Sequence, residues 1–495
     1  MKKILFLLFT YYFLCSIVVA QNTFFKIYRT IEHENAYEAI QASDGSFVLV
    51  GKKAEDYTFD TVKGFALRLD NSGNLLNELI LDNSNNSNFF IIDKAPDNVD
   101  QFLLMGAIDS VSNETSYSSL NICTVDINLQ VLSNNTFHTL KNHRICPWKH
   151  EMVNDSILYL LIVDLISIPV PQFIVSKVKL PGDSLTSFCT EDSQICVPQD
   201  ILYIPKSEKI NIYYFGQLIE KQHHIKTLQL DLELNYDTSF NAPQHMLSTI
   251  CSNKMNDSVY LLTATAQNPV PYVDSRTIST YKMKYNNDTI KSLKYFNHPD
   301  TILYAGFGTN TAINGTSIYI TGLYNIDPGS LPWQTTPTWI QITKADLDLN
   351  IISHHFYGGD ALYIPYCIIT TQDGGVFITG ITWNYNIPDN YQYDVFALKV
   401  DSAGTIVSVP EDATWQASEA ILYPNPGNDF FIAVIGAQHN IASLALYDMS
   451  GKPVIEIMLQ QDQTKVDTRH LPKGMYVYKI FNKDKPIGIG RWVKH

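Results

Sequence analysis

Acidic and histidine side chains stand near several expected strand ends, and their types could support acid–base or metal chemistry. The candidates are Glu32-His33-Glu34, His223-His224, His354-His355, Glu151, Asp300 and Asp360. The spacing matches no HExxH, GxSxG, P-loop or GxGxxG pattern, and the HEMVN stretch at His150 lacks the second histidine. Two carboxylates from separate parts of the fold could still converge, as glycoside hydrolysis requires. The motifs therefore predict no catalytic residue, no metal and no cofactor.

Aromatic side chains gather in two long connections of the second half of the chain. They are Trp333 in the connection 323–337, and Trp383, Tyr385, Tyr391 and Tyr393 in the connection 381–393. Aromatic faces beside amide and carboxyl groups can stack on sugars or grip a peptide. Packing of long loops onto the sheets below is the commoner role of such residues. We therefore hypothesise that these five residues form a ligand site.

Repeated strands are the elements that would position these residues. Turn pairs similar to Asp-Gly, each followed by an apolar strand, recur every 49 to 59 residues, at Asp44, Asp97, Asn154, Ser207, Asn256, Asn314 and Asp373. A second strand follows each turn, and most of these alternate apolar with polar residues, the period of a half-buried strand. Four strands per unit of about 50 residues predict an all-β chain with a seven-bladed β-propeller over residues 21–409.

The N-terminal segment 23–31 lies before the first complete unit. We expect it to pair with the seventh unit and close the ring, because an open ring leaves an exposed strand edge at each end. The short turns would then share one face of the ring, and the long connections would share the other. The ligand site is expected on the face of the long connections, because pockets need walls and convergent polar groups.

The first residues have the pattern of a secretory signal. Lys2 and Lys3 precede an apolar run over residues 4–19, and cleavage after Ala20 would define a signal peptide at 1–20. The run is shorter than the roughly 20 residues of a spanning helix, so we expect no transmembrane segment in the mature chain. Loss of the two lysines changes the net charge from −14 to about −16, which argues against a nucleic-acid partner.

The C-terminal part has a different pattern. After a polar linker at 410–420, short alternating strands with turns at Gly451 and Gly474 predict a small Ig-like antiparallel β-sandwich over 421–495. Four short motifs occur in it: Tyr423, Pro424, Asn425 and Pro426; Gly451 and Lys452; Leu471, Pro472, Gly474 and Tyr476; and Lys494 near the basic end. In this order and spacing the motifs resemble the type A C-terminal sorting domain of type IX (Por) secretion. The alternative is an Ig-like module with no export role.

The resemblance implies a partner, the type IX secretion machinery, and a location, secreted or on the outer-membrane surface by way of the periplasm. It also implies a sortase-like peptidase that can remove the domain. The repeat itself resembles propeller-type repeats of large secreted proteins of the Bacteroidetes, a repeat family with no shared active site. We therefore predict a binding or adhesion module for a glycan, peptide or protein. A propeller enzyme acting on a polysaccharide and a structural surface-layer component are the alternatives.

Overall fold

The computed structural model describes residues 22–495 except 57–60, 82–85, 97, 113–114, 142–143, 155, 165–171, 181–183, 190–195, 218–222, 244–245, 268–275, 295–301, 328–333, 388–391 and 407–417. The expected signal peptide lies outside the described residues. The named secondary-structure elements of the described part are all β-strands. Within the described residues, no helix is long and apolar enough to cross a bilayer.

The first half of the chain forms four antiparallel sheets in sequence order. Sheet 1 contains β2 (His33–Gln41), β3 (Phe47–Ala54), β4 (Val62–Leu69) and β5 (Leu75–Leu81). Sheet 2 contains β6 (Asn86–Ala95), β7 (Asn98–Ser112), β8 (Thr115–Asp126) and β9 (Val131–Lys141). Sheet 3 contains β10 (Ile145–Val153), β11 (Ile157–Asp164), β12 (Gln172–Lys179) and β13 (Ser184–Cys189). Sheet 4 contains β14 (Cys196–Ile204), β15 (Lys209–Gln217), β16 (His223–Asp231) and β17 (Tyr236–Asn241).

Three further antiparallel sheets follow. Sheet 5 contains β18 (Met246–Asn256), β19 (Val259–Gln267), β20 (Arg276–Lys284) and β21 (Thr289–Lys294). Sheet 6 contains β22 (Leu303–Ala305), β23 (Thr311–Asn314), β24 (Ser317–Tyr324), β25 (Trp339–Asp346) and β26 (Ile351–Gly358). Sheet 7 contains β27 (Leu362–Thr370), β28 (Val376–Trp383) and β29 (Asp394–Val400), and its fourth strand is β1 (Phe24–Tyr28) from the N-terminal end.

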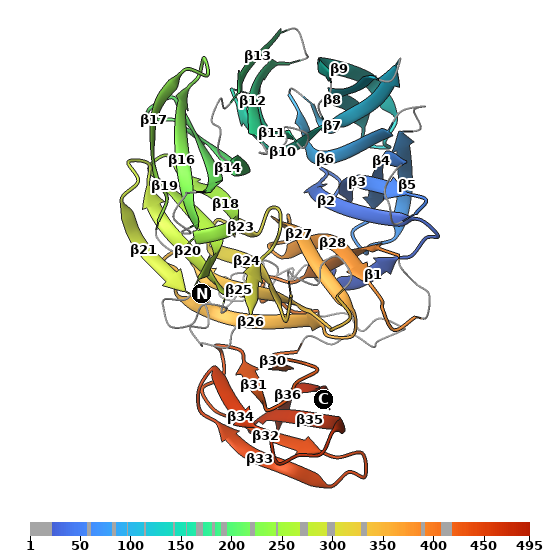
Figure 1. The fold of residues 1–495 in the computed structure, drawn as a ribbon, viewed down its shortest axis with the longest axis vertical. Helices are drawn as coiled ribbons and strands as arrows, with labels where there is room; N and C mark the ends of the chain where they lie inside the picture. The colour runs from blue at the N-terminus through green and yellow to red at the C-terminus, as the bar shows by residue number, and fades with distance from the viewer. Residues whose placement is uncertain are drawn as a thin grey trace, which may run out of the picture.

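The seven sheets lie around a common centre, with the first strand of each sheet innermost (Figure 1). Each sheet contacts the next, and β2 of sheet 1 contacts β27 and β28 of sheet 7. The predicted turn positions fall at or beside the junctions between first and second strands, although Asp97 itself lies outside the described residues. The seven recurring turn positions in the sequence thus correspond to seven sheets among the described residues.

The N-terminal strand pairs with the last sheet, as the sequence predicted. β1 is antiparallel to β29, with Phe24 opposite Lys399 and Tyr28 opposite Val395. The same strand also contacts sheet 1, because the Tyr28 hydroxyl donates to the Gly73 carbonyl at 2.7 Å. Gly73 has a φ of +77°, and a Cβ there would lie 2.5 Å from the Phe24 ring, so glycine is required for both reasons. β1 therefore contacts both the first and the last sheet of the series.

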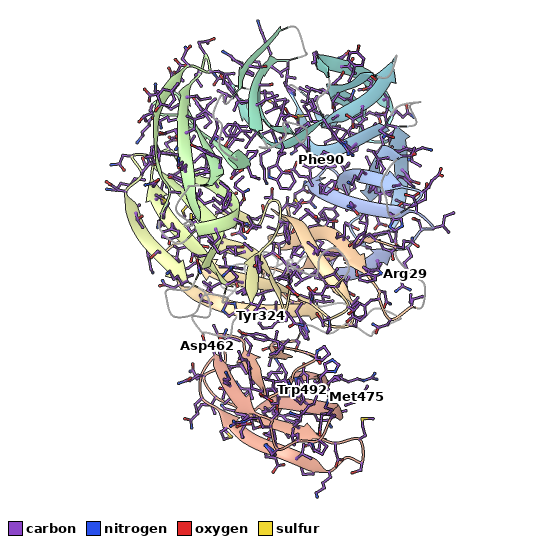
Figure 2. All side chains as sticks on the ribbon, in the orientation of Figure 1. Arg29, Phe90, Tyr324, Asp462, Met475 and Trp492 are labelled. Carbon is purple, nitrogen blue, oxygen red and sulfur yellow. The ribbon has the colours of Figure 1, made fainter. Side chains whose placement is uncertain are left out.

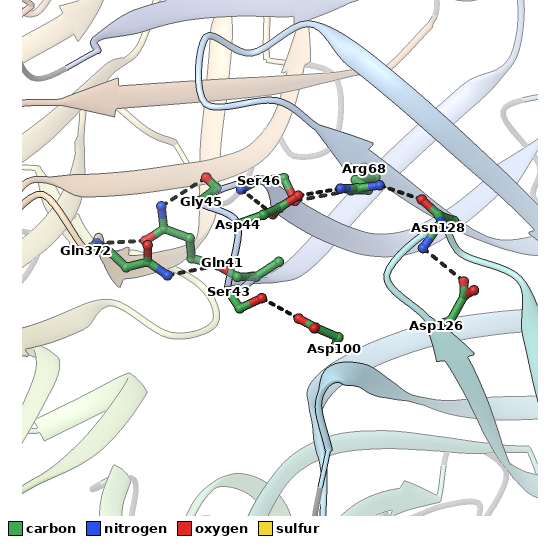
Figure 3. A network of polar contacts seen from close by, with 11 residues as sticks. Gln41, Ser43, Asp44, Gly45, Ser46, Arg68, Asp100, Asp126, Asn128 and Gln372 are labelled. Atoms are coloured by element: carbon green, nitrogen blue, oxygen red, sulfur yellow. Dashed lines mark hydrogen bonds and ion pairs between the residues drawn. The ribbon is translucent and has the colours of Figure 1, made fainter.

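The turns that contain Asp44 and Asp373 lie next to each other (Figure 3). The Gln372 amide N–H donates to Gln41 Oε1 at 2.7 Å, and the Gln372 side chain donates to the Ala42 carbonyl at 2.9 Å. Within sheet 1, Arg68 Nη2 donates to Asp44 Oδ2 at 2.5 Å. In sheet 7, Lys399 makes the equivalent pair with Asp373 at 2.5 Å. These contacts connect the first and last sheets on the side of the short turns.

An aspartate begins the turn that follows the third strand in five sheets. These residues are Asp70, Asp126, Asp231, Asp346 and Asp401. In each turn, Oδ1 accepts the backbone N–H groups two and four residues later, at 2.8–2.9 Å. The residue three positions after the aspartate has a positive φ, and it is Gly73, Leu129, Leu234, Leu349 or Gly404. The three leucines are buried, so core packing maintains a backbone conformation that leucine rarely adopts.

The C-terminal part consists of two antiparallel sheets that share one core. One contains β30 (Ala420–Tyr423), β31 (Phe430–Ile435) and β34 (Gln463–Asp467). The other has the order β33 (Pro453–Leu459), β32 (Ala442–Tyr447), β35 (Gly474–Asn482) and β36 (Lys485–Lys494). The ring of Trp492 is fully buried between them and contacts Phe431 and Tyr476. We call this unit the C-terminal sandwich.

The C-terminal sandwich docks on sheet 6 (Figure 1). Tyr423 and the buried Tyr324 place their ring centroids 5.0 Å apart. The backbones of Phe356, on β26, and Ser418 exchange two hydrogen bonds of 2.9 and 3.0 Å. Gln438 also contacts the backbone of His354 through both its side-chain oxygen and nitrogen. One apolar core therefore extends from sheet 6 into the sandwich.

Candidate functional site

The innermost strands share an irregularity at the same level. β2, β6, β10, β14 and β27 each contain one extra residue relative to their partner strand, and these residues are Tyr37, Phe90, Trp148, Gln199 and Tyr366. In sheet 5 the register shifts between Ser248 and Cys251, and in sheet 6 the inner strand is interrupted between β22 and β23. A bulge bends its strand and redirects a side chain. In all seven sheets, the regular pairing of the innermost strand is therefore interrupted near the centre.

Five aromatic residues at these breaks form what we call the collar: Tyr37, Phe90, Trp148, Phe307 and Tyr366. All five are half-buried. The Tyr37 ring stacks on Phe90 at 4.6 Å and meets Tyr366 edge-on at 5.1 Å. Phe307, between β22 and β23, lies 6.1 Å from Tyr366. Figure 2 shows Phe90 beside the common centre of the sheets.

A small hollow lies at the collar. Tyr37, Phe90, Trp148 and Tyr366 line it together with Glu38, Lys149, Gly308 and Thr309. Its volume is about 20 Å³, which is enough for one water molecule. The Lys149 ammonium crosses from sheet 3 to sheet 6, where it donates to Thr309 Oγ1 at 2.9 Å. The hollow therefore combines aromatic walls with an ammonium, a carboxylate and a hydroxyl.

Charged residues continue the lining of the centre beside the hollow. His150 Nε2 lies 3.0 Å from Asp93 Oδ2, and Lys254 Nζ lies 2.7 Å from Glu151 Oε2. Burial alone would lower the pKa of His150, but the hydrogen bond and charge of Asp93 raise it to about 9. Neutral pH therefore leaves this histidine charged.

Two further carboxylates of the inner strands accept hydrogen bonds from the next sheet. Glu38 accepts the Ile92 N–H at 3.0 Å, and Asp200 accepts the hydroxyl of Ser252 at 2.7 Å. Burial raises the pKa of both carboxyls, against the opposing charge of Lys149. No group of three or more His, Cys, Asp or Glu side chains in the described residues is arranged to hold a metal ion. The arrangement is suited to hydrogen bonding with a ligand at the centre.

Three of the five predicted loop aromatics pack in an apolar cluster next to two collar residues. The other two lie outside the described residues. Trp333 and Tyr391 belong to the segments that the structure does not describe. Trp383 and Tyr393 are 3% and 4% exposed and belong to one apolar cluster, against which Tyr385, Phe307 and Tyr366 pack. The half-buried Tyr385 meets Trp383 edge-on at 5.9 Å. The cluster that contains Trp383 and Tyr393 thus packs against the collar residues Phe307 and Tyr366.

The other candidates named from the sequence have separate surroundings. Glu34 is buried with the Lys53 ammonium at 3.2 Å, and burial raises the pKa of its carboxyl to about 6. His354 and His355 are both buried. The Tyr363 hydroxyl donates to Asp360 at 3.0 Å. Asp300 and the side chains of His223 and His224 lie outside what the structure describes.

The collar was not identified from the sequence, although one signal for it exists. The stretches PWKH, PQDI and PYCI place proline directly before the bulged residues Trp148, Gln199 and Tyr366. Proline inside a strand is confined mostly to edges and bulges. Three such prolines in equivalent strands indicate a shared bulge.

The motif residues of the C-terminal sandwich build its core and turns. Asn425 accepts the Val493 N–H at 3.0 Å and donates to the Arg491 carbonyl at 2.8 Å, so the YPNP loop is bonded to the last strand. Trp492 Nε1 donates to the Pro424 carbonyl at 2.9 Å. Lys494 Nζ reaches the Asn428 carbonyl at 2.6 Å.

The remaining motifs act in the same way. Tyr476 donates its hydroxyl to the Pro472 carbonyl at 2.7 Å, and Leu471 is buried beside it in the same core. Gly451 has a φ of +82° in the turn that Asp448 caps, and Lys452 donates its N–H to that aspartate. These two contacts are local, and each holds a turn of the sandwich.

Residues 421–493 match the family described as the secretion system C-terminal sorting domain. This match implies type IX export, to the cell surface or into the medium. No curated protein matches the chain.

Solved structures give distant likenesses. A fungal alcohol oxidase of the AA5 family in complex with copper is 8% identical over 95% of this chain and 98% of its own, with a TM-score of 0.46. The β-propeller domain of the Trilobed protease from Pyrococcus furiosus is 12% identical over 78% and 97%, with a TM-score of 0.42. A protein of unknown function from Dyadobacter fermentans is 8% identical over 61% and 93%, with a TM-score of 0.43. Scores of this size assign no activity to the chain.

Proposed function

We propose that the chain is a surface-attached or secreted binding module, built as a closed seven-bladed β-propeller and exported by type IX secretion. A signal peptide at 1–20 would take it to the periplasm, and the domain at 421–495 would take it across the outer membrane. The match of residues 421–493 to a sorting domain carries the export part of this proposal. The binding part is supported by the collar, where five sheets contribute aromatic side chains to one place.

Closure of the ring is supported by contacts at both ends of the series of sheets. β1 completes sheet 7, and its Lys26 ammonium donates to Asn74 Oδ1 of sheet 1 at 2.7 Å. The Phe47 ring of sheet 1 stacks on Phe377 of sheet 7 at 4.2 Å. A ring joined in this way leaves no free edge between its first and last blades.

The proposed ligand is a glycan, a peptide or a neighbouring protein, and it would enter from the face of the long connections. We propose that the site on this face also includes the five loop aromatics Trp333, Trp383, Tyr385, Tyr391 and Tyr393. Trp383 and Tyr393 would act by supporting Tyr366 and Phe307, as their burial suggests. Tyr385 would contribute the surface it exposes.

Three outcomes of one assay separate the functional classes. The full mature chain would be incubated with arrays of immobilised oligosaccharides and peptides, and with soluble polysaccharides followed by product analysis. Binding without turnover is the result we expect. Release of shortened products would establish the enzyme alternative, and an absence of both would favour a structural surface-layer component.

A further inference from the structure

We propose that the collar binds the terminal residue of a neutral glycan, with one sugar hydroxyl inserted into the hollow between Lys149 and Glu38. This inference rests on the proposed binding function and names its ligand. It is carried by the juxtaposition of partly exposed aromatic rings with a hollow that has both a hydrogen-bond donor and an acceptor.

The aromatic part of the site fits the apolar face of a sugar ring. Tyr37 and Phe90 lie nearly parallel, with an interplanar angle of 24°, whereas Tyr366 stands at 88° to Tyr37. All three residues are half-buried, so part of their surface is left for the apolar face of a sugar. Stacking of this kind contributes about 0.5–1.5 kcal/mol for each aromatic partner.

The polar part of the site fits a hydroxyl group. An ammonium has three N–H donors, and one of those of Lys149 goes to Thr309. Glu38 lines the same hollow as a hydrogen-bond acceptor. A hydroxyl can donate to a carboxylate and accept from an ammonium at the same time, and it has about the size of the water that the hollow can hold.

The charges disfavour the other small ligands that aromatic sites recognise. A quaternary ammonium group would sit close to Lys149, and like charges repel in a site of low polarity. A carboxylate or phosphate would meet Glu38 and would be larger than the hollow. An extended peptide binds best along a continuous open sheet edge, whereas bulges at Tyr37, Phe90 and Tyr366 interrupt the inner edge strands at the collar. The end of a neutral glycan meets none of these obstacles.

The test uses the full mature chain and free glucose, galactose, mannose and N-acetylglucosamine, measured by isothermal titration calorimetry. At least one sugar should bind, and Tyr37→Ala and Phe90→Ala should each weaken its binding about tenfold. Tyr37→Phe keeps the ring and should bind like the wild-type chain. Tyr236→Ala, on the outer strand β17 and 61% exposed, is the matched control and should change nothing.

A second measurement does not depend on the folding of any variant. Hydrogen exchange of the wild-type chain should slow at residues 306–310, which lie between β22 and β23 at the collar, when the bound sugar is added. An oligosaccharide array with hits, together with unchanged binding in both alanine variants or no protection at 306–310, would overturn the collar site and leave the binding function standing. Arrays with no hits would overturn the proposed function itself, and peptide hits alone would overturn the glycan assignment.

Discussion

Docking of the C-terminal sandwich on sheet 6 should depend on the contact between Tyr324 and Tyr423. Tyr324 lies at the junction of the two parts (Figure 2), and the Gln463 amide reaches its hydroxyl at 3.4 Å. Tyr423 is 1% exposed. Replacing it with alanine should cost about 3–5 kcal/mol, by analogy with other large aromatic truncations in cores. About 0.5–1.5 kcal/mol of this resides in the ring pair itself.

Hydrogen exchange can separate loss of docking from loss of fold. The Phe356 and Ser418 amides bond to each other's carbonyls across the junction, so Tyr423→Ala should increase their exchange rates together. The Val493 amide bonds to Asn425 inside the sandwich and should stay more protected. Tyr447→Ala, on β32, is the control for a tyrosine removed elsewhere in the sandwich. Unchanged protection at Phe356 and Ser418 in the Tyr423→Ala variant would show that the tyrosine pair does not hold the sandwich on sheet 6.

Three other perturbations test contacts within and between the seven sheets. Lys399→Met should destabilise the chain by about 3 kcal/mol in urea unfolding, because it leaves the partly buried Asp373 without its cation, and a loss below 1 kcal/mol would contradict this. Asp70→Ala should cost about 1 kcal/mol, since two backbone N–H groups lose their acceptor; an unchanged urea midpoint would speak against it. The raised pKa of His150 implies a stabilisation that is complete below pH 6.5 and lost as pH rises through about 9. The stability gap between wild type and His150→Gln should shrink over that interval, and a constant gap would count against the His150–Asp93 pair.

Local patterns carried much of the fold, because each sheet repeats the same turn and strand. Asp44 and Asp373 mark turns that the chain places side by side, and the pairing of β1 with sheet 7 was predictable from the unpaired N-terminal segment. The motif residues of the C-terminal sandwich were equally visible, because their order and spacing resemble those of a known sorting domain.

The collar and the docking of the C-terminal sandwich were harder to predict from the sequence, because both depend on the convergence of distant sheets. Tyr37, Phe90 and Tyr366 meet only when three bulged strands face one centre, and each alone reads as an ordinary strand residue. The loop aromatics were easier to see, yet Trp383 is buried because Leu362 and Tyr393 surround it. Tyr324 ends an apolar strand, and nothing in its neighbours indicates that a second domain covers it.

Surface exposure of the full chain in a bacterium with type IX secretion tests whether its C-terminal sandwich exports it. The chain and a version ending at residue 417 would be expressed in parallel, and protease added to intact cells would report which of them is outside. We expect the full chain to be surface-exposed or in the medium, whereas the truncated chain should stay in the periplasm. Equal surface exposure of both chains, or retention of the full chain inside the cell, would contradict this expectation.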